Sequence, residues 1–208
     1  MCDGLTGSIP ENIFANNTKL INELGSFALC DSLTGNIPTG IFANNLDIEY
    51  IMSTFTYCSG LTGSIPAEIF KNNTKVKDIS GVFDDCTNLS GTIPSNIFNY
   101  NTNVTTFYDV FGNCKGITGT IPENLFANNV NLTDMYGMFY GCSGITGTIP
   151  GNLFANNVNL KTLRGIFNEC SNISGTVPEN LLINNIKIED INSLFRKCTQ
   201  ITQIPTNI

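Results

Sequence analysis

The stretch GCSGITGTIP, Gly141 to Pro150, contains the pattern that decides the fold. Its cysteine is one of eight in the chain, and every interval between successive cysteines is 28 residues. So strict a period indicates that one supersecondary unit is copied along the chain and stacked on itself as a repeat solenoid. The units start at Cys2, Cys30, Cys58, Cys86, Cys114, Cys142, Cys170 and Cys198. The sequence therefore predicts a single solenoid over residues 1–208, with seven full coils and a partial eighth.

Aligned from the cysteine, which we number repeat position 1, the units read C-x-x-[LI]-[TS]-G-x-[IV]-P-x-x-[IL]-F-x-N-N and then continue through a second apolar cluster. Apolar and small polar residues alternate in LTGTIP, a pattern typical of a strand, and the proline ends it because it has no N–H for the ladder. The segment ENLFANN that follows Pro122 predicts one short helical turn. The later cluster around Leu160 and Leu163 predicts either a short strand or a helical turn. The expected solenoid is thus mainly β with short helical turns.

Two phenylalanine positions and one asparagine position recur in register and predict the core. Of fourteen phenylalanines, thirteen stand at repeat positions 13 and 26, where we expect them to point inward with the apolar residues of positions 4, 8, 12, 19 and 22. Asn17, Asn45, Asn73, Asn101, Asn129, Asn157 and Asn185 predict an amide ladder that bonds to turn backbone. Glu23 stands where other coils have an apolar residue, so we expect the first coil to be frayed or differently wound.

The cysteines share one repeat position, so each can reach only its copies in the neighbouring coils. We interpret them as a file of buried thiols acting as small hydrophobic groups. Pairing between adjacent coils stays open, because the strand spacing lies within the range that a disulfide permits. The chain has no histidine, and a single file of sulfurs cannot surround a tetrahedral ion, so we expect no metal site and no cofactor. The missing histidine also argues against an enzyme.

Composition excludes two classes of partner. The net charge is −7, with ten lysines and arginines in 208 residues, so the chain lacks the basic surface that nucleic acid requires. No apolar run reaches the length of about 18 residues that a transmembrane helix needs, so we expect no direct membrane insertion.

The outward side chains at repeat positions 5 and 7 are the candidate binding site. Both positions carry small hydroxyl residues in nearly every coil, which predicts two files of hydroxyl groups on one exposed sheet face. Solenoids use such extended faces for recognition. The candidate residues are Thr6, Ser8, Thr34, Asn36, Thr62, Ser64, Ser90, Thr92, Thr118, Thr120, Thr146, Thr148, Ser174 and Thr176.

The string NVNLTDMYGMFYGCSGITG resembles the leucine-rich repeats of BspA-like bacterial surface proteins, whose units run through an aromatic residue to Cys and then Leu-Thr. The resemblance extends over all seven units. It implies a leucine-rich-repeat-like solenoid on an extracellular or cell-surface protein. The function that it implies is that of a non-enzymatic adhesion or protein-interaction module. The partner that it implies is a protein or a cell-surface ligand.

Two other functions are compatible with the sequence. Both ends resemble interior units, so end-to-end self-association into a filament is one alternative, and the abrupt ends also suggest a fragment of a longer protein. Ice binding through the threonine and serine files is the other alternative.

Overall fold

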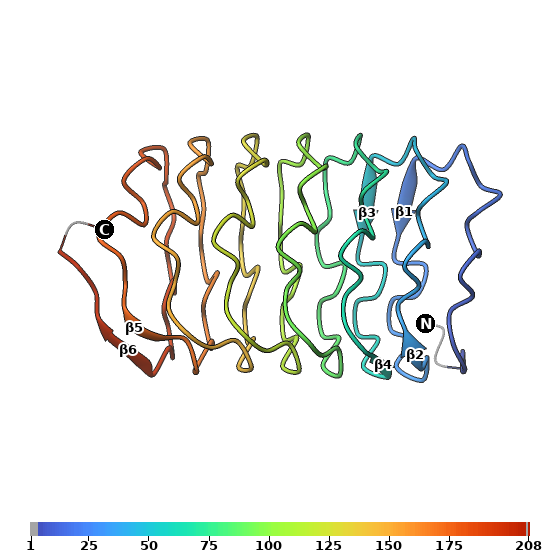
Figure 1. The fold of residues 1–208 in the computed structure, drawn as a ribbon, viewed down its shortest axis with the longest axis horizontal. Helices are drawn as coiled ribbons and strands as arrows, with labels where there is room; N and C mark the ends of the chain where they lie inside the picture. The colour runs from blue at the N-terminus through green and yellow to red at the C-terminus, as the bar shows by residue number, and fades with distance from the viewer. Residues whose placement is uncertain (1–3, 207) are drawn as a thin grey trace.

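The computed structural model describes residues 4–206 and 208 and shows one elongated solenoid, whose coils follow one another from the N-terminal to the C-terminal end (Figure 1). Its strands are very short, and the described residues form no helix. They are β1 (Asn22–Leu24), β2 (Gly35–Asn36), β3 (Tyr50–Met52), β4 (Leu61–Thr62), β5 (Ser174–Thr176) and β6 (Gln200–Gln203). Cys2, the start of the first unit, lies outside the described residues.

The first ladder joins the coils at repeat position 21, in the upper half of Figure 1. Strands β1 and β3 pair in parallel with Glu23 opposite Ile51, so equivalent residues of successive coils lie side by side. Single bridges continue this register from Tyr50 to Asp78 and onward to Asp190. The sequence predicts either a short strand or a helical turn for the second apolar cluster of each unit. The structure shows a strand-like ladder there.

The second ladder joins the LTG segments, along the lower edge of Figure 1. Strand β2 pairs with β4 and β5 with β6, all in parallel, and single bridges link the coils between them. The partners are 26 residues apart, as in Ser64 with Ser90, although the repeat is 28 residues long, and the register shifts by one residue at a bulge where Thr176 pairs with Gln203. The strand predicted in LTGTIP is present, but each copy is displaced by two residues relative to its neighbour.

The predicted helical turn after the proline does not form. In the sixth unit the N–H groups of Leu153 and Ala155 donate to the carbonyls of Pro150 and Asn152, at 3.2 and 3.0 Å. These bonds span three residues, whereas an α-helix requires four. The segment is a series of tight turns, because the Phe154 carbonyl that could extend it already accepts from the Asn157 N–H and from the Asn185 side chain of the next coil.

Two phenylalanine stacks fill the core along the whole solenoid, as the sequence predicts. Rings at repeat position 26 lie parallel to their copies, with centroids 5.8 Å apart for Phe83 and Phe111 and 6.0 Å for Phe111 and Phe139. Rings at position 13 form a second stack, with 6.0 Å between Phe126 and Phe154. These side chains are fully buried, so each coil buries its apolar face against the two neighbouring coils.

The asparagine ladder is also present and holds each turn to the coil before it. The Asn129 amide nitrogen donates to the carbonyls of Phe98 and Asn101, at 3.1 and 2.9 Å, and the side chain is fully buried. Asn45, Asn73, Asn101, Asn157 and Asn185 make the same pair of bonds. The amides therefore give each of these turn carbonyls a second donor, in addition to the backbone N–H that it already accepts.

The cysteines form the expected file of buried thiols. Each Sγ from Cys58 onward donates to a phenylalanine carbonyl of the preceding coil, as Cys142 does to Phe111 at 2.9 Å. Cys58, Cys86, Cys114, Cys142, Cys170 and Cys198 are all free of disulfides. Burial is the main cause that raises the pKa of the Cys142 thiol to about 12.

We expect these thiols to be unreactive in the folded chain. At pH 8 a thiol with a pKa of about 12 is ionised in only about one molecule in ten thousand, and the thiolate is the reactive form. Iodoacetamide should therefore leave Cys114 and Cys142 unmodified in the native chain and modify both in guanidinium, as read by mass spectrometry of the peptides. Equal labelling rates in the two conditions would contradict the buried file.

The expectation that the first coil is frayed or differently wound is wrong. Strand β1 pairs in register with β3, and Glu23 is buried at its regular inward position. One carboxylate oxygen accepts the Ser26 N–H at 3.0 Å, and the other accepts the hydroxyl of Thr54. The sequence contains the signal for this pairing, because Ser26 and Thr54 occupy a repeat position that is apolar in the later coils.

Candidate functional site

The predicted hydroxyl residues lie on the second ladder and face the solvent. Thirteen of the fourteen are exposed, and Ser174 is half-buried. They therefore form a continuous polar surface that extends over all the coils. No other set of equivalent small polar residues in the described chain is exposed at two positions in every coil, which makes this surface the principal candidate for partner binding.

The displacement of the second ladder changes how these residues are arranged. Because the bridges join residues 26 apart, Thr92 at position 7 of one coil pairs with Thr118 at position 5 of the next. Ser64 pairs with Ser90 in the same way, and Asn36 with Thr62. The prediction of two separate files is therefore wrong in its geometry. The residues of the two positions meet as pairs, and each pair carries side chains from two adjacent coils.

The two members of a pair have different local roles. The Thr118 hydroxyl at position 5 donates to the Gly91 carbonyl at 3.2 Å, and the Thr146 hydroxyl does the same to Gly119 at 3.3 Å. The position 7 side chain instead covers the position 6 glycine of the next coil, and a Cβ added at Gly119 would lie only 2.8 Å from the Thr92 methyl group. These glycines also have positive φ, 80° at Gly119, so the position accepts other residues poorly. Position 5 is therefore the better place to perturb recognition without perturbing the fold.

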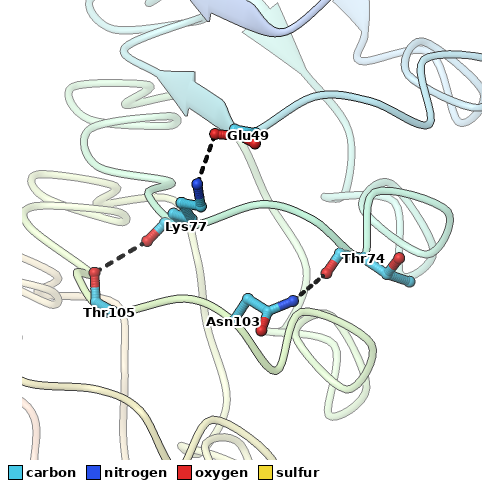
Figure 2. Close-up of polar contacts among 5 residues, drawn as sticks. All are labelled: Glu49, Thr74, Lys77, Asn103 and Thr105. Atoms are coloured by element: carbon cyan, nitrogen blue, oxygen red, sulfur yellow. Dashed lines mark hydrogen bonds and ion pairs between the residues drawn. The ribbon is translucent and has the colours of Figure 1, made fainter.

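A second polar surface lies beside the first ladder, where a shallow hollow of about 520 Å³ is lined by Glu49, Lys75, Lys77, Asn103, Thr105 and Asn131. Figure 2 shows its polar contacts, which connect successive coils. Lys77 Nζ donates to Glu49 at 2.7 Å, and Lys75 Nζ donates to Asp47 at 2.7 Å. Asn103 Nδ2 donates to the Thr74 carbonyl at 2.9 Å (Figure 2).

These contacts limit what the hollow can bind. Both lysines are held by carboxylates, which raise the pKa of each ammonium group and largely neutralise its charge. The asparagine amide nitrogen is already committed to the backbone, so its oxygen is the group left for a ligand. The hollow is therefore a weakly charged hydrogen-bonding surface, and it has no unpaired lysine that would attract an anion.

Half-buried carboxylates gather at the turns that follow the first ladder. Asp84 and Asp109 each have a pKa raised to about 7, mainly because burial disfavours the charged form, and the neighbouring Asp85 adds repulsion to both. No ion pair reaches either side chain in the part of the chain that the structure describes. The described residues also contain no cluster of three or more metal-ligating side chains.

We expect the double variant Asp84→Asn, Asp109→Asn to be more stable than the wild type at pH 8. A carboxyl whose folded pKa is about 7 and whose unfolded pKa is near 4 stabilises the fold when protonated, and this contribution is lost as pH rises from 4 through 7. After allowance for solvent screening, removing the charges should raise Tm by about 2–4 °C at pH 8 and flatten its fall between pH 5 and 8. Asp31→Asn, an exposed control, should change neither quantity.

The family comparison decides where the chain belongs. The family model described as "Mycoplasma protein of unknown function, DUF285" matches residues 51–181, which is more than half of the chain. The chain belongs to this family. A search of curated proteins finds no match. The family description assigns no activity, so the function has to be inferred from the surfaces described above.

The leucine-rich-repeat fold is supported by a solved structure with a TM-score above 0.5. A chain of the Drosophila Toll–Spatzle complex has a TM-score of 0.56 at 20% identity, over 91% of this chain and 25% of its own length. The leucine-rich-repeat protein of T. pallidum has a TM-score of 0.40 at 16% identity, over 80% of this chain and 66% of its own. This member of the DUF285 family thus spans about a quarter of the Drosophila chain that it matches. Its described residues include no helix long and apolar enough to cross a bilayer.

Proposed function

We propose that the chain is a non-enzymatic interaction module of a cell-surface or extracellular protein, and that it binds a macromolecular partner on its second ladder. The observation that carries the proposal is the set of exposed hydroxyl pairs between adjacent coils, as in Ser64 with Ser90 and Thr92 with Thr118. The same register continues to Gly147 with Ile173, so a partner that spans several coils meets similar polar groups from coil to coil and weak hydrogen bonds add along the solenoid.

Two further considerations support this proposal. The sequence resemblance to BspA-like surface proteins favours an extracellular location and an adhesive role. The leucine-rich-repeat structure that this chain resembles is a chain from a complex of Toll with Spatzle. By analogy, we propose that the partner of this chain is also a protein. The described residues offer no arrangement of nucleophile, base and orienting group that would favour catalysis.

The proposal is tested by comparing two double variants of the same chemistry. Thr118→Arg with Thr146→Arg places bulky charges on the second ladder, while Thr105→Arg with Thr133→Arg places them on the first. All four hydroxyls donate to a backbone carbonyl of the preceding coil at 3.2–3.3 Å, so the variants are matched in local geometry.

Fluorescently labelled wild-type chain should attach to cultured animal cells, as counted by flow cytometry. The second-ladder variant should lose about 90% or more of this attachment, the effect expected when bulky groups enter the centre of an interface. The first-ladder variant should keep it, and both should retain the wild-type circular dichroism. Equal attachment by both variants would place the binding surface elsewhere.

A further inference from the structure

A hollow of about 340 Å³ lies on the turns that follow the first ladder, away from the hydroxyl pairs. It is lined by Asp109, Tyr136, Gly137, Tyr140, Gly165 and Asn168. The residues come from three consecutive coils, the fourth to the sixth in the numbering of the aligned units. The hollow is therefore a product of stacking, and no single repeat contains it.

Two successive glycines create the space. At repeat position 24 the coils carry Gly25, Ser53, Gly81, Asp109, Gly137, Gly165 and Ser193. Only the fifth and sixth of these are adjacent glycines. The Asp109 side chain lies across Gly137, where an added Cβ would collide with its Oδ1. A Cβ at Gly165 would meet nothing closer than 3.8 Å, so the space above this glycine is open.

At pH values above its pKa of about 7, Asp109 brings to the hollow a negative charge that no described cation pairs with. Its carboxylate is partly buried and forms no ion pair with a described residue, and this burial is the main cause of its raised pKa. The Arg164 guanidinium lies over the ring of Tyr136, which also lines the hollow, at 5.8 Å, and its Nη1 is 3.8 Å from Asp190 rather than paired with Asp109. The site thus holds a carboxylate that a cation from outside the chain would stabilise.

The other side chains of the hollow can also accept a donor. The Asn168 side chain lines the hollow, and its Oδ1 is buried with no hydrogen-bond partner in the described chain. The hydroxyls of Tyr136 and Tyr140 accept hydrogen bonds as well. The Tyr136 ring already contacts the Arg164 guanidinium and the stacked Tyr108 ring, so its hydroxyl is the group left for a ligand.

We propose that this hollow binds a primary ammonium group, presented by a lysine side chain of the partner protein. An ammonium carries three donors on one compact centre, and the hollow is lined by a carboxylate, an amide and two tyrosines, all of which carry acceptor oxygens. An ammonium is a compact point charge, whereas a guanidinium is a larger planar group with its donors in a fixed fork, so we expect the hollow to favour the ammonium. The net charge of −7 also attracts a basic partner. The inference rests on the proposed interaction function and names the chemistry of one partner group.

The experiment titrates the ¹⁵N-labelled full chain with Nα-acetyl-lysinamide at pH 8 and follows the amide signals of Gly137 and Gly165 by NMR. Saturable shifts with a Kd of roughly 1–10 mM are expected, the range of a single small cationic contact. Nα-acetyl-norleucinamide, which has the same carbon chain and no ammonium, should produce no saturable shift. Nα-acetyl-argininamide should bind at least about threefold more weakly.

Three variants make the outcome decisive. Asp109→Asn should weaken lysinamide binding about tenfold, and Asn168→Asp, which adds a carboxylate at nearly the same volume, should strengthen it several-fold. Asp31→Asn removes the same charge far from the hollow and should leave Kd unchanged. Binding of norleucinamide as tight as that of lysinamide, unchanged affinity in Asp109→Asn, or no saturation by lysinamide would each overturn the proposal. None of these results bears on attachment through the second ladder, so the two proposals can fail separately.

Discussion

Replacing Phe126 by alanine is expected to lower the free energy of unfolding by about 3–5 kcal/mol, the usual cost of emptying a fully buried aromatic site. Phe126 lies 6.0 Å from Phe154 and 5.9 Å from Phe107 between ring centroids, and its side chain has no exposed surface. The cavity left by the ring would remove packing contacts with the coils on both sides of Phe126. Urea denaturation followed by circular dichroism measures the change.

The seventh coil provides the control for this prediction. It carries Leu182 at the same repeat position, packed against the core. Phe126→Leu should therefore cost less than about 1.5 kcal/mol, because the position tolerates a side chain of this shape. If alanine and leucine at this site destabilised the chain equally, the loss of the aromatic ring itself, rather than the loss of filled volume, would account for the destabilisation.

Asn129→Ala is expected to lower the free energy of unfolding by about 2–3 kcal/mol, because two buried carbonyls each lose a donor. Its neighbour provides a matched comparison. The Asn128 amide donates to the Asn99 carbonyl at 3.1 Å on the exposed surface, where water can replace it. Asn128→Ala should cost no more than about 0.5 kcal/mol.

The same denaturation experiment compares the two asparagine variants. A loss of stability in Asn129→Ala well above that in Asn128→Ala indicates that the buried amide file holds the turns together. Similar small losses in both would mean that the turn carbonyls find other partners.

The inward faces of the coils were predictable because stacking forces each repeat position to contact its own copies. The 28-residue interval between successive cysteines, Cys142 among them, defines the period. The phenylalanine and asparagine files follow from that period as packing and hydrogen-bonding constraints. These features depend only on residue type and register along the repeat. The structure confirms them at Phe126, Asn129 and Cys142.

Features that depend on how neighbouring coils are offset were not predictable in the same way. A shift of two residues in the second ladder leaves the repeat length unchanged, so the contact of Thr92 with Thr118 has no signal in the 28-residue period. The tight turns that replace the expected helical turn arise from the competition for the Phe154 carbonyl, which involves the next coil. Both errors concern contacts between units, while the period describes each unit by itself.

The hollow at Asp109 and Gly165 was not predicted, for a different reason. Its residues stand at repeat positions that vary from coil to coil, whereas the period predicts only the positions that do not vary. A signal was present, because Gly137 and Gly165 are the only successive glycines at their repeat position. In this chain the departure from the repeat marks where the hollow lies. End-to-end assembly and ice binding stay predictions.

The most direct test of the central claim, that partners bind on the second ladder, is site-specific photocrosslinking. The photoreactive residue p-benzoylphenylalanine is placed at Thr118 in one chain and at Thr105 in another, and each chain is irradiated on cells to which it has attached. We predict a covalent adduct of one defined partner from Thr118 and none from Thr105. Adducts from Thr105 alone, or equal adducts from both positions, would contradict the claim.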